Sequence, residues 1–484
     1  MKRYLLFAFC CLVFGIVPTA CSSWLDVGSK SEVDETEMFT TREGYYATLT
    51  GIYLNLGTTA LYGGNLPLLA LEPLTQQYLV DADAPDRQQW SQFNYTTDGG
   101  QQLVNDIWLT MFNTIVNANM LLSQLDRAPQ AGVPAATTDI LRGETLALRA
   151  LMYFDLVRLF DAAVPAADAV AVANATSNVP FKTDFGFRLG DVLTTDSLLE
   201  RLAADLRTAR RLLEADPWVT GQTATDEYTA YDRRQRMNGD ACTALLSRLE
   251  LYRGHYAAAD SLARQLLSSR RYRYIRADEV VQTDAYGAEL SADRLFVPEL
   301  IFALYTDNIL TTSRSNYEGL TGDFVKTADH YEESDLRRQW LFSNPSALGK
   351  INLIRYQRSI RQQDQQRYGD PVVPILKLSE MQLIAAECAL QRGDSDEAIS
   401  QLNTLREARG ESLLSLDSST ADIDAALTHE YQCDFRGEGQ LFYYYKRRAF
   451  PAIDDGYGKG NTVSVAPSAY TLPLPPYEIQ FGHR

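Results

Sequence analysis

Two segments of the chain repeat one helix–turn–helix pattern, and this repeat constrains the fold more than any other feature. Residues 244–270 and 383–409 both place apolar side chains at helical spacing on either side of a glycine. Each glycine is followed five residues later by an alanine (Gly254 and Ala259; Gly393 and Ala398). This is the tetratricopeptide pattern, in which the small residue lets two helices approach closely. Because the units are far apart rather than in tandem, we expect helix pairs embedded in a larger α-rich domain, not a uniform solenoid.

Apolar residues recur with a helical period through most of the chain, so we expect a mainly α fold. Thr40 with Glu43, and Ser197 with Glu200, have the spacing of a capping box at a helix start. Where the period breaks down, we expect long irregular loops that can hold short strands or hairpins. The predicted helices cover 102–126, 140–160, 198–213, 238–253, 256–269, 377–391 and 395–408. The predicted loops cover 161–179, 218–236, 306–320, 343–374 and 451–470.

The N-terminus has the features of a bacterial lipoprotein signal peptide over residues 1–20. Lys2 and Arg3 precede an apolar run at 5–17, which is shorter than the roughly 20 residues that a membrane-spanning helix needs. Small residues then lead to Cys21, which would become the acylated first residue of the mature protein. Acyl chains on one residue would hold the protein durably at a membrane. The alternative is an ordinary secretory signal with an incidental cysteine.

Charge and residue usage exclude several classes of function. The formal net charge is −17, and such a surface repels phosphate backbones, so we expect no nucleic-acid partner. The four histidines fall in no recognisable metal or nucleophile motif, so we predict no catalytic residues, no metal site and no cofactor. Cys242 and Cys388 lie within helical patterns, where we expect buried thiols rather than a disulfide framework.

Several segments, in the same order along the chain, resemble the SusD/RagB family of Bacteroidetes outer-membrane nutrient-binding lipoproteins. Individually they are weak, but their order and spread over nearly the whole mature chain make the combined resemblance specific. They are CSSWLD from Cys21, GETLALRALMYFDLVRLFDAAVP at 143–165, LKLSEMQLIAAECALQRGDSDEAISQLNTLREARG at 376–410, HEYQCDFRGEGQLFYYYKRR at 429–448 and YTLPLPPYEI at 470–479.

The resemblance implies a single large SusD-like domain over 21–484, with an N-terminal part at about 21–235 and a C-terminal part at about 236–484. It also implies a protein lipid-anchored in the cell outer membrane and facing outside. Such a protein caps a SusC-like TonB-dependent transporter, captures an oligosaccharide or in some members a peptide, and delivers it inward. The membrane contact would be the lipid anchor alone.

Charged residues inside otherwise apolar helical frames have a structural interpretation. Buried charges must be paired, so we expect intramolecular ion pairs that tie helices together. The residues concerned are Arg149, Glu387, Arg406 and Glu438.

For sugar stacking, aromatic residues in loops are better candidates than those on helices. Trp90 and Tyr95 are the leading candidates, followed by Tyr78 and Tyr317, because tyrosine and tryptophan combine a flat apolar face with a polar edge. Polar contacts could come from Asp83, Arg87 and Gln89. Each of these residues could instead serve in packing.

Two alternative functions are left open. The tetratricopeptide-like pairs on their own would suit a scaffold lipoprotein that grips a protein partner and has no small ligand. A glycoside hydrolase is the lesser alternative, since nothing selects a catalytic pair among the 62 acidic residues.

Overall fold

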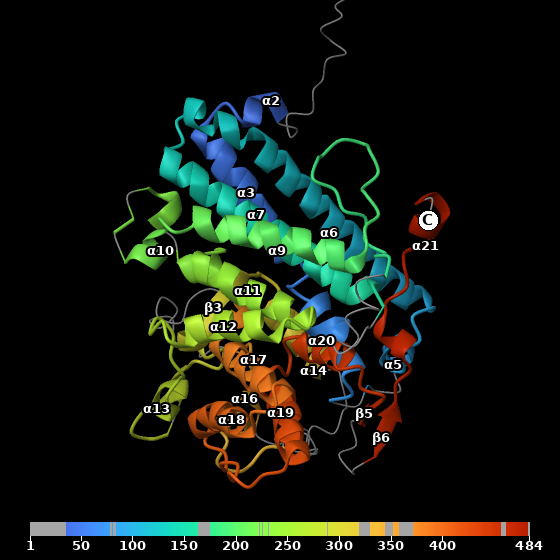
Figure 1. Cartoon of the computed structure of the whole chain (residues 1–484), viewed down its shortest axis with the longest axis vertical. Coiled ribbons are helices and arrows are strands. Elements are labelled where there is room, and N and C mark those ends of the chain that lie inside the picture. The colour runs from blue at the N-terminus through green and yellow to red at the C-terminus, as the bar shows by residue number, and fades with distance from the viewer. Residues whose placement is uncertain are drawn as a thin grey trace, which may run out of the picture.

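Helices stacked across the long axis of the molecule form most of the structure (Figure 1). The computed structural model describes residues 35–77, 80, 84–162, 175–221, 223–224, 226–230, 232–287, 289–318, 330–343, 352–357, 371–455 and 461–482. The longer helices are α3 (Arg42–Leu56), α6 (Asp98–Gln124), α7 (Ala135–Phe160), α9 (Thr195–Leu212), α11 (Gly239–Tyr252), α12 (Tyr256–Leu267), α14 (Ile309–Glu318), α17 (Leu378–Gln391), α18 (Ser395–Arg409), α19 (Thr420–Asp434) and α20 (Gln440–Arg447). The short helices are α2 (Glu35–Met38), α4 (Leu71–Leu74), α5 (Pro85–Ser91), α10 (Pro217–Thr220), α13 (Ala277–Val280), α16 (Leu336–Leu341) and α21 (Pro476–Phe481). The mainly α fold predicted from the sequence is confirmed.

The two tetratricopeptide-like pairs are α11 with α12 and α17 with α18. Their turn glycines, Gly254 and Gly393, have φ of +77° and +76°, a left-handed conformation that costs side-chain-bearing residues strain. Ala259 and Ala398 are fully buried, and the Ser247 hydroxyl donates to the Ala259 carbonyl oxygen at 2.8 Å where the helices touch. The predicted helix pairs are therefore present.

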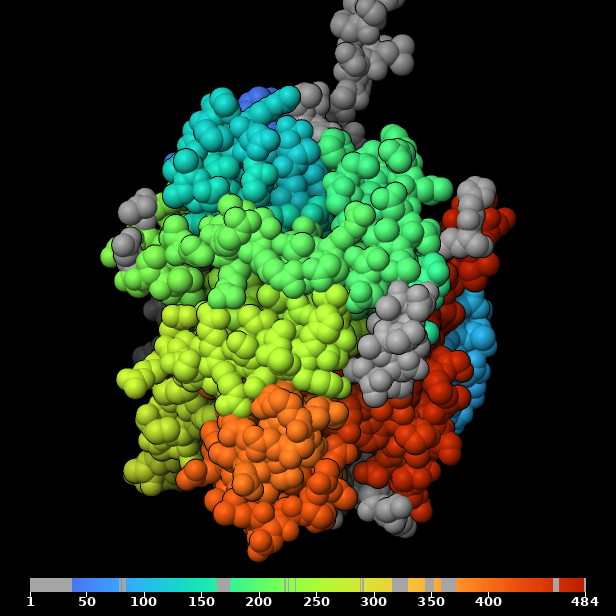
Figure 2. Space-filling model, viewed as in Figure 1, coloured from blue at the N-terminus to red at the C-terminus, as the bar shows by residue number. Residues whose placement is uncertain are grey.

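The pairs are not isolated from one another. α12 packs against α17, so units far apart in the sequence lie side by side, and α9 and α7 extend the same row. Figure 2 shows this order as successive bands from teal through yellow-green to orange. Arg264 of α12 reaches Glu397 of α18 at 2.5 Å and links the two pairs. The helix pairs thus form one continuous stack within the domain.

Two predicted helix starts are wrong. α3 is capped by Thr41, whose hydroxyl accepts from the Gly44 N–H at 3.2 Å, rather than by Thr40. α9 is capped by Thr194, which accepts from the Ser197 N–H at 3.2 Å. α9 begins early because the Thr195 hydroxyl is buried and donates to the Asp161 carboxylate at 2.8 Å, which fixes the first turn.

Residues 309–318 form α14 where the sequence predicts a loop. Threonine, serine and asparagine in this segment are weak helix formers, so propensity gives no helix signal. Ile309 is 1% exposed and Ser313 is 2% exposed, and α14 packs against the short π-helix Asn65–Leu69. Tertiary packing therefore overrides the local preference.

Three antiparallel strand pairs interrupt the helices in the part of the chain that the structure describes. Two join strands that are close in sequence, and of these only the pair at 452–464 lies in a predicted loop; the third joins two strands across a long interval. The pairs are β1 (Val281–Thr283) with β2 (Glu289–Ala292), β3 (Leu300–Tyr305) with β4 (Val372–Lys377), and β5 (Ala452–Asp454) with β6 (Thr462–Ser464). β4 is buried along its whole length and β3 up to Leu304, which places this pair inside the core.

The predicted ion pairs are all formed. Each buried charge finds a partner on another element, which satisfies both desolvated groups. The pairs are Arg149 with Asp205 at 2.7 Å, Glu387 with Arg447 at 2.5 Å, Arg406 with Glu430 at 2.9 Å, and Glu438 with Lys377 at 2.9 Å. Cys242 and Cys388 are buried free thiols, as predicted.

Residues 1–20 and Cys21 lie outside the described residues. In the part of the chain that the structure does describe, every helix is too short or too polar to cross a membrane.

Candidate functional site

An open hollow lies between α3, the segment before α11 and the end of β3. Its volume is about 240 Å³. Hydroxyl, carboxylate, amide and guanidinium groups surround it together with two aromatic rings. The lining residues are Thr50, Tyr53, Leu54, Asp232, Gln235, Arg236 and Tyr305. Such a mixture can contact both the apolar face and the polar edge of a ligand.

Tyr53 lines one wall of this hollow, and hydrogen bonds hold its side chain in place. Its hydroxyl donates to the Glu144 carboxylate at 2.6 Å, and Glu144 is held by Arg233 at 2.7 Å. Burial raises the pKa of Tyr53 well above its ordinary value, and the charge of Glu144 adds to that rise, so the phenol stays neutral. The Arg236 guanidinium lies 4.5 Å from the centre of the Tyr53 ring in cation–π geometry. The ring and the guanidinium are therefore positioned before any ligand arrives.

A second hollow, of about 180 Å³, is lined by residues that follow β3 and residues at the start of β4, among others. Tyr305 lines the first hollow and Asp307 lines the second, and the Tyr305 hydroxyl donates to the Asp307 carboxylate at 2.5 Å. The second hollow is more apolar. It is lined by Leu295, Asp307, Ile309, Leu310, Tyr356, Pro371 and Val372. The turn at 305–310 thus connects the two candidate sites.

The two leading sequence candidates lie in the core. Trp90 is 2% exposed, and its indole N–H donates to the Ala70 carbonyl oxygen at 2.7 Å. Tyr95 is 8% exposed, donates to the Ala469 carbonyl oxygen at 2.5 Å, and meets the Trp90 ring edge-on with 4.8 Å between ring centres. Neither ring has an open face in this conformation, so a ligand-binding role for them stays a prediction.

The structure describes the other predicted site residues only in part. Tyr78 and Asp83 lie outside the described residues. Tyr317 falls within α14, where the backbone alone is described. Arg87 is half-buried on α5, and the side-chain oxygen of Gln89 accepts from the Asn94 amide at 2.8 Å. A shared ligand site formed by this set therefore stays a prediction.

The residues that line the first hollow were not predicted from the sequence, because they come from three distant segments. Thr50, Asp232 and Arg236 carry no motif. Tyr305 had a detectable signal, since it ends the apolar run LIFALY immediately before Thr306 and Asp307. An aromatic residue at the last position of a buried strand is well placed to lie half in the core and half in solvent.

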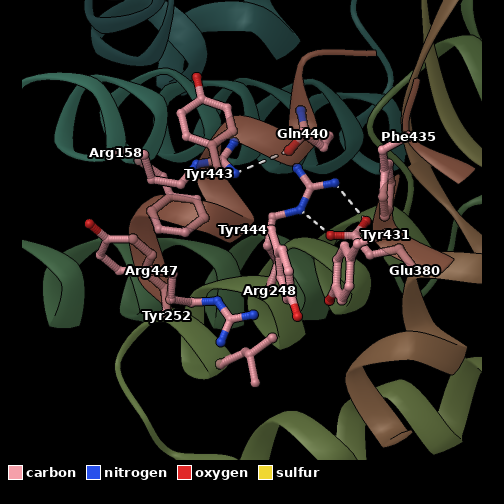
Figure 3. Close-up of a pocket in the computed structure, with 12 residues that line it drawn as sticks. Arg158, Arg248, Tyr252, Glu380, Tyr431, Phe435, Gln440, Tyr443, Tyr444 and Arg447 are labelled. Carbon is pink, nitrogen blue, oxygen red and sulfur yellow. Dashed lines mark hydrogen bonds and ion pairs between the residues drawn. The ribbon is translucent and has the colours of Figure 1, made fainter. Parts of the chain in front are cut away.

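A third cavity, of about 30 Å³, lies among charged and aromatic side chains where α20 meets α7, α11 and α17 (Figure 3). Arg248 contacts the two Glu380 carboxylate oxygens at 2.5 and 2.6 Å, and Arg158 lies 3.6 Å from the centre of the Tyr443 ring. The space suffices for one or two water molecules. These contacts fasten α20 to the helical stack, and the cavity is too small to be a nutrient site.

Sequence profiles decide the family. The profile described as "Starch-binding associating with outer membrane" matches residues 23–250, and the profile described as "SusD family" matches residues 331–471. The chain belongs to the SusD/RagB family. The curated proteins compared with the chain include no match.

Solved structures of SusD-like proteins share the fold over nearly the whole chain. A SusD-like carbohydrate binding protein from Bacteroides vulgatus ATCC 8482 aligns with a TM-score of 0.66 and 16% identity, over 91% of this chain and 96% of that chain. A SusD superfamily protein from Bacteroides thetaiotaomicron VPI-5482 aligns with a TM-score of 0.68 and 20% identity, over 91% and 98%. A SusD superfamily protein from Bacteroides fragilis gives a TM-score of 0.68 and 20% identity, over 92% and 98%. At these identities the likeness establishes the fold alone.

Proposed function

We propose that this SusD/RagB protein is a lipid-anchored outer-membrane protein, facing outside, that binds an oligosaccharide and delivers it to a SusC-like TonB-dependent transporter. Peptide is the alternative ligand. We further propose that 21–235 and 236–484 are parts of one domain, since α9 packs directly on α11. The protein would act by binding, without a catalytic step of its own.

The hollow lined by Tyr53, Arg236 and Tyr305 is the observation that supports ligand binding most directly. A sugar ring presents C–H groups on its faces and hydroxyls at its edge, and this hollow offers the partly exposed ring of Tyr305 together with hydrogen-bonding groups. Its volume of about 240 Å³ is below the ~300–1,000 Å³ of pockets that enclose a whole small molecule. It would therefore take one unit of a longer chain, with further units lying over the second hollow beside Asp307.

Replacing Tyr305 by alanine tests this site. Loss of an aromatic contact of this kind is expected to weaken binding by about 1–3 kcal/mol, which is roughly a 5- to 150-fold rise in Kd. Tyr305→Phe keeps the ring and should retain most of the affinity. The matched control is Tyr286→Ala, because Tyr286 is 96% exposed on the β1–β2 turn and lines neither hollow.

The measurement is calorimetry with malto-oligosaccharides, other glycans and peptides as probes. Binding of a glycan that depends on Tyr305 and not on Tyr286 supports the proposal. Binding of peptides alone would change the ligand class. Equal affinity of the wild type and Tyr305→Ala would remove this hollow from the site.

Replacing Cys21 by alanine tests the anchor. The variant should move from the membrane fraction to the soluble fraction without unfolding, because it loses the acyl chains that hold it. Palmitate labelling that persists in the variant would contradict lipidation at Cys21.

A further inference from the structure

Two potential metal ligands lie one turn apart on α19. His429 and Cys433 are four residues apart and share a helix face, and the Cys433 sulfur lies 3.5 Å from the His429 Nε2. His330, in the turn before α16, brings its ring centre to 4.8 Å from that of His429. Ligand atoms of all three residues lie within 4.8 Å of one another.

The separation on α19 matches a coordination sphere. Zn²⁺ binds imidazole nitrogen at about 2.0–2.1 Å and thiolate sulfur at about 2.3 Å, so a tetrahedral angle places these two atoms about 3.6 Å apart. The observed distance between the His429 Nε2 and the Cys433 sulfur is 3.5 Å. An ion could therefore bind both residues without any movement of α19.

The hydrogen bonds of His330 prepare it to bind a metal. The Gln432 side-chain nitrogen donates to the Tyr445 hydroxyl at 2.9 Å, which leaves the Gln432 oxygen facing the His330 Nε2 at 2.8 Å. Because that oxygen can only accept, the His330 Nε2 carries the proton and Nδ1 keeps its lone pair. Metal-binding histidines are commonly oriented in this way, by donating their other ring N–H to a fixed acceptor.

Two carboxylates lie beside this cluster. The nearer Glu411 oxygen lies 3.2 Å from the His429 Nε2, and Glu411, His429 and Glu430 form a second group with ligand atoms within 4.8 Å of one another. Arg337 contacts Glu411 and Glu430, each at 3.0 Å, and Arg406 contacts the same two carboxylates, each at 2.9 Å. The two carboxylates therefore balance the two guanidinium groups, and the Cys433 thiolate is the group that would balance the charge of a bound cation.

We propose that His330, His429 and Cys433 form a Zn²⁺ site with three protein ligands, in which a water molecule would take the fourth position. Two imidazoles and one thiolate are ligands that favour zinc over magnesium or calcium. The Cys433 thiol releases its proton to solvent as the metal–sulfur bond forms. His429 is 25% exposed, which leaves an entry path from the surface.

The site was not visible in the sequence because His330 is far from the other two residues along the chain. The spacing of His429 and Cys433 alone is common on helices, and the third ligand comes from another element. The prediction that the chain has no metal site is therefore replaced by this proposal. The site is built from different residues than the Tyr305 hollow, so either proposal can fail without the other.

Titration of the purified protein with Co²⁺ and Zn²⁺ tests the site. We expect one high-affinity Co²⁺ per chain, with the absorption band of a cobalt–thiolate bond that Zn²⁺ then displaces. Cys433→Ser should abolish the band, and His330→Ala should weaken affinity by about tenfold or more. One proton should be released per Zn²⁺ bound, measured as a buffer-dependent enthalpy.

Matched controls separate this site from surface binding. Cys388→Ser removes another buried thiol and His255→Ala removes a histidine elsewhere, and both variants should keep the band and the affinity. His330→Ala alters a half-buried turn residue, and circular dichroism will show that it remains folded. Absence of the thiolate band in the wild type, or equal affinity in the wild type and His330→Ala, would overturn the proposal.

Discussion

The ion pair between Glu387 of α17 and Arg447 of α20 offers a direct test of how the helical stack is held together. The Glu387 carboxylate accepts two hydrogen bonds from the guanidinium, at 2.5 and 2.7 Å. The side chains are 0% and 7% exposed, so neither charge is solvated by water. Replacing Glu387 by glutamine keeps the shape of the side chain. It places an amide N–H opposite a guanidinium N–H, so one of the two hydrogen bonds is lost.

Removing one partner of a buried pair costs about 3–5 kcal/mol, because the other charge is left buried without compensation. Glutamine retains one acceptor, which places the expected loss near 3 kcal/mol. Arg448 lies 4.0 Å from Glu387 but is also paired with Asp424 at 2.8 Å, so it should add little. Against a total stability of about 5–15 kcal/mol, this loss is large.

Urea unfolding followed by circular dichroism measures the effect as a lower midpoint with an unchanged slope. The matched control is Glu43→Gln, whose pair with Arg42 is 3.4 Å long and largely exposed. That variant should change the free energy of unfolding by no more than about 0.5 kcal/mol. If Glu387→Gln loses no more stability than Glu43→Gln, the argument that the buried pair fastens α20 to α17 is refuted. Replacing both Glu387 and Arg447 by apolar residues should recover much of the loss, because no unpaired charge remains.

Two further predictions concern the buried residues Glu72 and Trp90. Burial raises the pKa of Glu72 to about 7, although the Gly437 N–H donates to its carboxylate at 2.8 Å. The stabilisation that the protonated Glu72 contributes is therefore full below about pH 4.5 and is lost as the pH rises through about 7. In urea unfolding, Glu72→Gln should remove up to about 3 kcal/mol of this pH dependence of the unfolding free energy. A difference between the two proteins that stays constant over this range would contradict the shift. Trp90→Ala should lower the free energy of unfolding by about 3–5 kcal/mol in thermal or urea melts, since it empties a packed site and orphans the Ala70 carbonyl. Unchanged stability with lost ligand binding would instead favour the sequence-based interpretation of Trp90.

The sequence predicted the helical elements well where the apolar period was long. α6, α7, α11, α12, α17 and α18 each lie within a few residues of their predicted bounds, because their buried faces leave a regular pattern. The buried charges were also predicted, since an isolated charge within an apolar frame must be paired. The helix starts were less accurate, because Thr41 and Thr194 cap through backbone geometry that spacing alone does not reveal.

The candidate site could not be derived in the same way. Trp90 and Tyr95 satisfied the rule that loop aromatics bind ligands, yet both fill the core, because an indole or phenol suits a buried carbonyl as well as a sugar. Tyr305, Arg236 and Thr50 approach one another only after β3 has paired and α3 has packed. Information about such a site resides in tertiary contacts rather than in local spacing.

The β3–β4 pair has a consequence for how this fold diversifies. The Thr306 N–H donates to the Pro371 carbonyl oxygen at 2.8 Å, so the chain leaves the core and re-enters it at adjacent points. Closing a longer loop costs only about 0.6 kcal/mol per doubling of its length. The residues that follow β3, which contribute Asp307, Ile309 and Leu310 to the second hollow, can therefore change in length and sequence between relatives while the strands stay fixed. Arg337, later in the same interval, is buried against Glu430 of α19 and has to be kept. Evolution, or a protein engineer building chimeras, can exchange recognition surfaces at this position without redesigning the helices that carry them.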